Sequence, residues 1–107
     1  MKRGDVWTAR SSSGYGSKPR PVIIVQAAGI DSYESVVLCL LTSYESDGMD
    51  FRVRIEPSEA NGLAATSWAM AEKIIAMPKA SLGERIGVID DETMTAIGGQ
   101  LAKLLGL

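Results

Sequence analysis

The sequence has 107 residues, of which 46% are hydrophobic and 22% are charged, and its formal net charge is −2. This composition predicts a compact folded chain rather than a disordered one, and the length predicts one domain over residues 1–107. No apolar run is long enough to cross a membrane, and no apolar segment of a secretory signal follows the N-terminal cations, so we expect a cytoplasmic protein with no membrane partner.

Two residue types that carry much of enzyme chemistry are scarce. The sequence contains no histidine, which removes the most common general base and metal ligand. Its single cysteine, Cys39, lies in the apolar run VVLCLL without a partner for a disulfide or a metal site. We expect Cys39 to be a buried, unreactive side chain. Catalysis would depend on Arg, Lys, Tyr, Ser, Thr, Asp or Glu, and we expect neither a metal nor another cofactor.

Apolar patterns separated by turn residues predict roughly five to seven short strands. In chain order these segments are 4–9, 20–26, 35–43, 51–56, 66–77 and 84–89, the fifth being one bent strand or two. The third, SVVLCLLTS, is apolar enough to be buried on both faces. In the fourth, FRVRIE, strict alternation predicts that Arg52 and Arg54 face solvent. The Ser/Gly-rich stretch 11–19 is the most loop-like part of the chain.

The C-terminal segment 90–107 has the pattern of a helix. Asp90 suits the N-cap, and the two acidic residues after it complement the helix dipole, so the acidic trio needs no metal ion. Apolar residues at helical spacing form one stripe: Met94, Ile97, Leu101, Leu104 and Leu105. Gly98 and Gly99 are either a tolerated weakness or the site of a close contact with a sheet or another subunit. Strands followed by one helix predict a mainly β fold, a small barrel or strongly curved sheet closed by the helix.

Positive charge is concentrated at the start of the chain. Residues 1–20 carry a net charge of +4, which leaves −6 for residues 21–107. The basic side chains either solubilise the surface or form a local basic groove on an acidic protein. A domain of this size is only marginally stable alone, so a dimer would be unsurprising.

Arg20 stands between Pro19 and Pro21 at the entrance to the apolar strand VIIV. The prolines restrict the backbone on both sides, and a guanidinium presented there matches a phosphate in bidentate fashion. Alternatively, Arg20 only marks the strand end and its stem covers apolar surface. Thr42 ends the next strand, where its hydroxyl could satisfy a free backbone group. If both strands end at one rim, Arg20 and Thr42 could stabilise charge on a common phosphate.

Four segments resemble, in the same order, the MazF/PemK family of toxin endoribonucleases: KRGDVW, KPRPVIIVQ, LLTSYESDGMDFRV and NGLAATSWAMAEKI, followed by the amphipathic helix. The resemblance covers essentially the whole chain. It implies an SH3-like β-barrel of the MazF/CcdB type that forms a homodimer. It also implies a toxin that inhibits translation by cutting single-stranded RNA at short sequences, and that is blocked by a MazE-like antitoxin peptide.

The resemblance also implies a reaction in which no metal takes part. The 2′-hydroxyl attacks the adjacent phosphate and leaves a 2′,3′-cyclic phosphate and a 5′-hydroxyl. Arg20 corresponds to the catalytic arginine of the RPV motif, and Thr42 to the assisting threonine. We expect Arg20 to stabilise charge rather than to shuttle a proton, because the pKa of a guanidinium exceeds about 12. Further candidates for RNA contact are Arg10, Tyr15, Ser17, Lys18 and Ser43, with Tyr15 either stacking on a base or simply exposed in its loop.

Two other functions compete with this one. A non-enzymatic CcdB-like toxin shares the fold and poisons DNA gyrase, but depends on a tryptophan near its C-terminus. This chain ends in KLLGL, and its tryptophans are Trp7 and Trp68. An inactive SH3-like interaction module is disfavoured only by the presence of Arg20 and Thr42. The slightly negative net charge departs from what an RNA-binding protein would prefer, although a dimer could line its basic segments along one groove.

Overall fold

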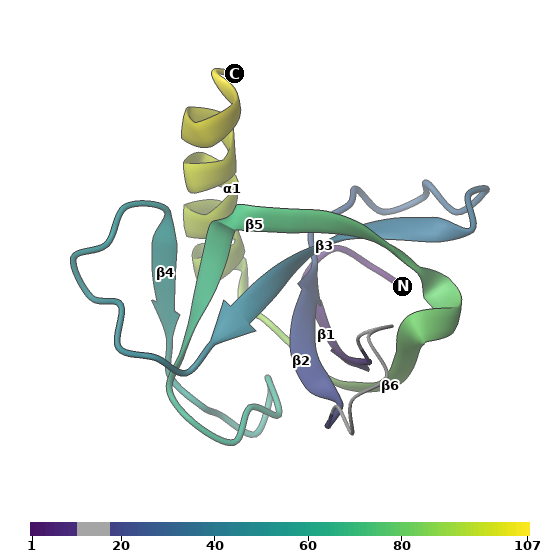
Figure 1. Cartoon of the computed structure of the whole chain (residues 1–107), viewed down its shortest axis with the longest axis horizontal. Coiled ribbons are helices and arrows are strands. Elements are labelled where there is room, and N and C mark those ends of the chain that lie inside the picture. The colour runs from purple at the N-terminus through teal and green to yellow at the C-terminus, as the bar shows by residue number, and fades with distance from the viewer. Residues whose placement is uncertain (11–17) are drawn as a thin grey trace.

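The computed structural model describes residues 1–10 and 18–107 (Figure 1). Its strands are β1 (Asp5–Ala9), β2 (Arg20–Ile24), β3 (Ser35–Thr42), β4 (Arg52–Ile55), β5 (Ser67–Pro78) and β6 (Leu82–Val88). A short 3₁₀ turn, η1 (Lys79–Ser81), joins β5 to β6, and the chain ends in the helix α1 (Asp91–Leu105). The predicted strands and the predicted helix are therefore confirmed. Among the described residues, no helix is long and apolar enough to cross a membrane.

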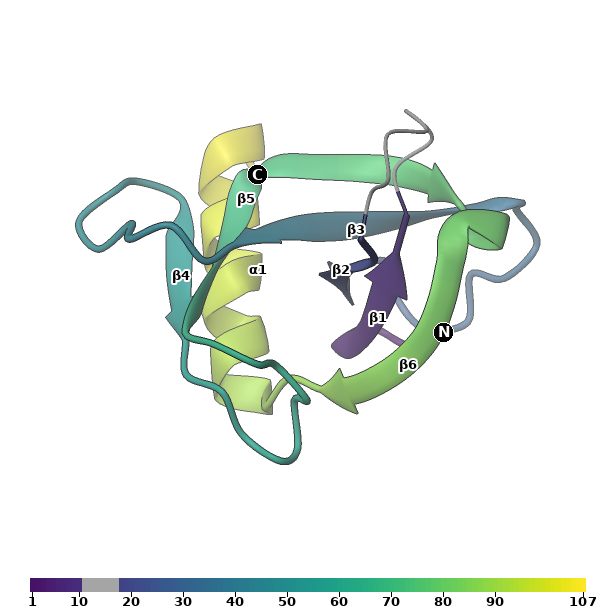
Figure 2. The same cartoon turned by 60° about the horizontal axis from the view of Figure 1, so that its bottom comes forward.

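The six strands form one sheet in the order β4-β5-β3-β2-β1-β6, and neighbouring strands are antiparallel. Within the described ranges the edge strands β4 and β6 do not pair with each other, so hydrogen bonds do not close the sheet. The sheet instead curls strongly, with β6 swinging round toward the helix side (Figure 2). This is the barrel-like form of the curved sheet that the sequence predicts.

Strand β5 is one bent strand that pairs with two neighbours. Cys39 and Leu40 are adjacent in β3, yet they pair with Ile74 and Met70 of β5. Residues 71–73 therefore have no partner in β3 and form a bulge, which bends the strand and turns its side chains in new directions. Before the bulge β5 pairs with both β4 and β3, and beyond it β5 pairs with β3 alone in the described part of the chain.

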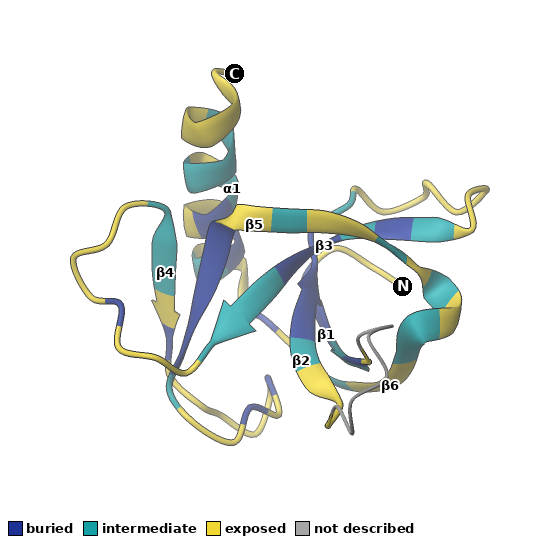
Figure 3. Cartoon of the chain, in the orientation of Figure 1, coloured by how far each residue is buried: buried dark blue, intermediate teal, exposed yellow. Residues whose placement is uncertain are grey.

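Apolar side chains are buried on both faces of the sheet. On one face, Ile23 and Cys39 belong to a cluster that includes Met94 and Ile97 of α1. On the other face, Val22 and Leu38 belong to a second cluster, which the curled strands β1, β5 and β6 cover with partly buried side chains. The centres of β2 and β3 are consequently buried (Figure 3), as the apolar run of the third segment predicts.

Helix α1 begins where the sequence predicts. Asp90 is the N-cap, and its carboxylate accepts hydrogen bonds from the Thr93 backbone N–H (3.2 Å) and hydroxyl (2.6 Å). The helix packs on β4 and β5, but its C-terminal turns project past the sheet (Figure 1). The predicted apolar stripe is therefore buried only in part, because Leu104 and Leu105 are exposed. The apolar stripe predicts contact with the sheet along the whole helix, but the last turn does not make that contact.

The two glycines of α1 have different surroundings. A Cβ atom at Gly98 would lie 3.0 Å from Nη2 of Arg3, whose Nη1 donates a hydrogen bond to the carbonyl of Val25. A Cβ atom at Gly99 would meet nothing within 4 Å. Within the described residues, the close contact considered for this pair is found at Gly98, and its partner is the N-terminal segment; a contact with another subunit stays a prediction.

Candidate active site

Arg20 and Thr42 lie at the same rim of the sheet. Strands β2 and β3 pair at Ile24–Leu38, Ile23–Cys39 and Val22–Leu40, and the same register continued by two residues sets Arg20 against Thr42. Residues that face each other across an antiparallel pair point to the same side of the sheet. Pairing ends at Val22–Leu40 and the strands then diverge (Figure 1), and no hydrogen bond of the described residues joins the two side chains.

Arg20 is exposed and opens β2, where it pairs with Ala9 of β1. It borders an apolar pocket of about 190 Å³, whose other lining residues are Ala9, Val22, Leu40, Ile75 and Met77. The stem of an arginine can cover such a surface while its guanidinium stays in water. The aliphatic stem of Arg20 can therefore lie on apolar surface while its guanidinium is accessible to a ligand.

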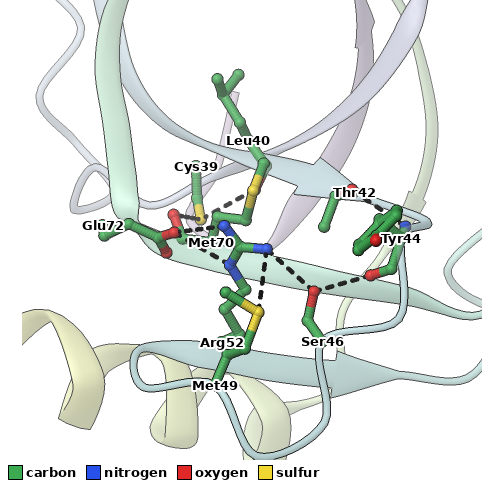
Figure 4. Close-up of polar contacts among 9 residues, drawn as sticks. All are labelled: Cys39, Leu40, Thr42, Tyr44, Ser46, Met49, Arg52, Met70 and Glu72. Atoms are coloured by element: carbon green, nitrogen blue, oxygen red, sulfur yellow. Dashed lines mark hydrogen bonds and ion pairs between the residues drawn. The ribbon is translucent and has the colours of Figure 1, made fainter.

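Thr42 is half-buried and its hydroxyl has a defined partner. The backbone N–H of Tyr44 donates a hydrogen bond to Thr42 Oγ1 over 3.1 Å (Figure 4). A hydroxyl carries one donor hydrogen and two acceptor lone pairs. The Tyr44 contact uses one lone pair, so the Thr42 O–H remains available to donate elsewhere. The hydroxyl does satisfy a backbone group, as one interpretation of the sequence proposes, without losing its donor.

The turn after β3 is connected to the sheet by Ser46 and Arg52. Ser46 is buried, its Oγ donates to the carbonyl of Tyr44 (2.8 Å), and Nη1 of Arg52 donates to Ser46 Oγ (3.0 Å). The Arg52 Nε and Nη2 atoms donate to Oε2 of Glu72 at 3.0 and 2.7 Å. Burial alone would raise the pKa of Glu72, but its hydrogen bonds and the Arg52 charge outweigh burial and lower it.

The solvent-facing prediction for Arg52 is wrong. Its side chain is only 12% exposed, whereas Arg54, two residues along the same strand, is 49% exposed as predicted. The reason is the bulge at 71–73, which brings Glu72 against the guanidinium and covers it. A cation with so little exposure to solvent requires such a partner.

Asp47 provides a second connection for the same turn. Its carboxylate accepts a hydrogen bond from Nε1 of Trp68 (2.9 Å) and one from Nη1 of Arg54 (2.6 Å). The guanidinium of Arg54 also lies over the Trp68 ring, 5.6 Å from its centre. The Trp68 hydrogen bond, together with the Arg54 contact, lowers the pKa of Asp47. The turn is therefore held to the sheet at two adjacent residues, Ser46 and Asp47.

Comparison with known proteins identifies the family. The family model described as PemK-like, MazF-like toxin of type II toxin-antitoxin system matches residues 2–105. The chain belongs to this family. It is 36% identical over 107 residues to the probable endoribonuclease MazF of Mycolicibacterium smegmatis, covering 100% of this chain and 98% of that protein.

Solved structures of MazF proteins share the fold. An endoribonuclease from a mycobacterial species, solved in complex with its cognate antitoxin, superimposes with a TM-score of 0.81 at 28% identity, over 100% of this chain and 96% of that one. The Mycobacterium tuberculosis toxin MazF-mt6 superimposes with a TM-score of 0.80 at 20% identity, over 96% of this chain and 97% of that one. The expected MazF-type fold is confirmed.

In this MazF-family toxin, most other predicted contact residues lie near the same rim. Arg10 follows β1 and is exposed, its N–H donates to the carbonyl of Ser81, and it lines a pocket of about 470 Å³ that Pro19 also borders. Lys18 and Ser43 are exposed, next to β2 and β3 respectively. Tyr15 and Ser17 lie outside the described residues.

The sequence of this toxin did not predict the contacts of three residues around the turn after β3: Ser46, Arg52 and Glu72. Ser46 is a small polar residue in a polar turn, and nothing in the sequence sets it apart from its exposed neighbours. For Arg52 and Glu72, the alternation of side chains along a strand predicts charged residues exposed at the surface. Only a pairing of opposite charges across β4 and β5 could have indicated their contact.

Cys39 is a core residue of this MazF-type fold. It is fully buried, and its Sγ donates to the carbonyl of Met70 over 3.3 Å. Burial raises the pKa of the Cys39 thiol to about 12, so the nucleophilic thiolate does not form near neutral pH. The prediction of a buried, unreactive cysteine is confirmed as to burial, and the raised pKa accords with low reactivity.

Proposed function

We propose that this MazF-type toxin endoribonuclease cleaves single-stranded RNA by means of Arg20 and Thr42, without a metal ion. The observation that supports the proposal is the register of β2 and β3, which ends at Val22–Leu40 and, continued by two residues, would set Arg20 against Thr42 at one rim. A cation and a hydroxyl donor around one phosphate can stabilise the charge that builds up in phosphoryl transfer. RNA as the substrate class is supported by the related Mycolicibacterium smegmatis protein, which is named a probable endoribonuclease.

In the proposed reaction the 2′-oxygen forms a bond to the adjacent phosphorus as the bond from phosphorus to the 5′-oxygen breaks. The 2′-hydroxyl loses a proton and the leaving 5′-oxygen gains one, which gives a 2′,3′-cyclic phosphate and a 5′-hydroxyl. Arg20 stabilises the doubly charged pentavalent phosphorus through its planar fork. Thr42 donates its O–H to a non-bridging oxygen, a role supported by the Tyr44 N–H on the other side of its oxygen.

RNA binding is proposed to use the basic and hydroxyl side chains of the same rim. Arg10 and Lys18 are exposed near Arg20, and Ser43 is exposed next to Thr42. The sequence also offers Tyr15 and Ser17 for this role. Contacts between cations and phosphates release counterions, so binding should weaken steeply as salt is raised.

The proposed partners are a second copy of the chain and a MazE-like antitoxin peptide that covers the RNA groove. The antitoxin proposal is supported by the related mycobacterial endoribonuclease, which was solved in complex with its cognate antitoxin. The homodimer is supported by the small size of the chain and by its exposed apolar side chains, among them Leu104, Leu105 and Leu107. The biological outcome of RNA cleavage is inhibited translation.

The test is incubation of the protein with a long defined RNA in EDTA, followed by mapping of the new ends by primer extension. The proposal predicts discrete cuts with 5′-hydroxyl ends, which disappear with the Arg20→Ala variant. DNA of the same sequence should stay intact because it lacks the 2′-hydroxyl. Intact RNA together with inhibited gyrase supercoiling would favour the CcdB-like alternative.

A further inference from the structure

We infer that Ser46 and Arg52 are positioning residues, which orient the Thr42 hydroxyl through the backbone around Tyr44. The inference rests on the proposed function, because it concerns how Thr42 is set up to donate to the RNA phosphate. Neither Ser46 nor Arg52 hydrogen-bonds to Thr42 directly, and their effect passes through the turn that follows β3 (Figure 4).

The connection consists of hydrogen bonds on both sides of the Tyr44 backbone. Ser46 Oγ donates to the Tyr44 carbonyl over 2.8 Å, and the Tyr44 N–H donates to Thr42 Oγ1 over 3.1 Å. Both peptide groups that flank the Tyr44 Cα atom are therefore restrained. Because the Ser46 hydroxyl has a single hydrogen, its bond to Arg52 Nη1 at 3.0 Å must use a lone pair. Arg52 thus directs the Ser46 hydrogen toward Tyr44.

Burial sets Ser46 apart from the other side chains that follow Thr42, which is itself paired with Trp68 of β5. Between residues 43 and 47, only Ser46 is buried, at 2% exposure, while the Tyr44 side chain stands out in solvent at 78% exposure. A hydroxyl buried this deeply requires both of its partners, since an unsatisfied buried polar group is costly. Tyr44 itself contributes backbone groups to the site.

Glu72 completes the arrangement from the opposite strand. Its Oε2 accepts from two nitrogens of Arg52, which holds the guanidinium plane at one angle and aims the remaining Nη1 at Ser46. Glu72 occupies the bulge at 71–73, the only departure from regular pairing between β3 and β5 in the described chain. The bulge is therefore the structural feature that supplies the partner of Arg52.

The experiment measures single-turnover cleavage and KM on a short RNA that carries a site cut by the wild-type protein. The variants are Ser46→Ala and Arg52→Met, each alone and combined with Thr42→Val. Arg54→Met is the matched control, because Arg54 lies on the same strand and contacts the same turn, but through Asp47, beyond Ser46. Melting curves define a temperature at which every variant is folded.

We expect Ser46→Ala and Arg52→Met to lower the cleavage rate at least about tenfold with KM changed less than about twofold, because small misplacement of a catalytic group is costly in rate. Arg54→Met should stay within about twofold of wild type. In the Thr42→Val background, Ser46→Ala should have no further effect, because the residue it positions is gone. If Ser46 had a purely structural role, Ser46→Ala would lower the cleavage rate by the same factor in the wild-type and Thr42→Val backgrounds.

If Arg52→Met fails to fold, Ser46→Ala decides the outcome. Ser46→Ala removes only one oxygen atom and is the smaller change to the fold. A wild-type rate for Ser46→Ala beside a slow Thr42→Val would overturn the inference and leave the proposed function standing. An equal loss from Ser46→Ala in both backgrounds would overturn it as well. If the wild-type protein leaves RNA intact, or if Thr42→Val cleaves at the wild-type rate, the proposed function fails and the inference fails with it.

Discussion

Arg20 stands opposite Thr42 when the register that pairs Val22 with Leu40 is continued to the ends of β2 and β3. The strands are antiparallel, so the first residue of β2 and the last residue of β3 lie at the same rim of the sheet, two residues beyond the last pair of the ladder. Pro19 and Pro21 restrict the backbone of Arg20, while the Tyr44 N–H restrains Thr42. The two groups proposed for catalysis are thus presented from the ends of two sheet strands.

The Thr42 hydroxyl is expected to be required as a donor. Thr42→Val removes the O–H and keeps the shape, so the cleavage rate should fall by about 10²–10³-fold, the usual cost of one lost donor. Thr42→Ser keeps the hydroxyl and the Tyr44 contact, and its rate should remain within about tenfold of wild type. Rates are measured under single-turnover conditions in EDTA. Equal rates for the valine and serine variants would contradict this role.

Cys39 is expected to be protected from alkylation. Because burial raises the pKa of its thiol to about 12, iodoacetamide at pH near 8 should not modify the folded protein. In denaturant the same residue should react completely, as mass spectrometry will show. Cys39→Ala should cleave RNA at the wild-type rate. Rapid modification of the folded protein would show that the thiol opens to solvent.

The glycine pair of α1 is expected to respond unequally to alanine. Gly99→Ala meets nothing within 4 Å, so the free energy of unfolding should rise by about 1 kcal/mol from helix propensity. Gly98→Ala places a Cβ atom 3.0 Å from Nη2 of Arg3, so part of that gain is lost in displacing the guanidinium. Thermal denaturation followed by circular dichroism compares the two. A larger gain at Gly98 than at Gly99 would contradict the packing described for Arg3.

The Asp90 cap is expected to make stability depend on acid pH. Hydrogen bonds from Thr93, first from its hydroxyl and then from its N–H, lower the pKa of Asp90 below its ordinary value of 3.8. Because the pKa of this carboxyl is lower in the folded state, the unfolded chain binds the proton more tightly than the folded protein does. The contribution of the Asp90 carboxylate to the free energy of unfolding is therefore complete well above pH 3.8. It is lost as the pH falls through the lowered pKa that Asp90 has in the folded state.

Asp90→Asn tests this directly, because asparagine is an equally good N-cap that does not titrate in this range. Urea denaturation between about pH 5 and pH 2 should show a shallower loss of stability in the variant than in the wild type. Identical slopes in the two proteins would show that Asp90 is not among the groups responsible.

Local patterns predicted much of this fold because they depend on neighbouring residues alone. Alternation and turn residues placed the strands, the cap of α1 followed from Asp90, and the apolar run around Cys39 indicated burial on both faces. The rim shared by Arg20 and Thr42 could be expected once two consecutive strands were taken as antiparallel. Each of these inferences needs only a short stretch of chain.

Features that depend on distant contacts were not predictable. Arg52 is covered by Glu72, which is 20 residues away and is brought there by the bulge in β5. Ser46 is buried and accepts a hydrogen bond from Arg52, and a polar turn gives no sign of either. Leu104 and Leu105 are exposed because α1 projects past the sheet, which the helical spacing cannot reveal.

The coupling between Arg20 and Thr42 tests the account most directly. Single-turnover cleavage of one RNA substrate in EDTA is measured for wild type, Arg20→Met, Thr42→Val and the double variant. If both groups act on one phosphate, each single variant is slowed by about 10²-fold or more, and the double variant is slowed by clearly less than the product of the two. Arg20→Met with the wild-type rate, or two losses that multiply exactly as independent sites would, contradicts a shared catalytic phosphate.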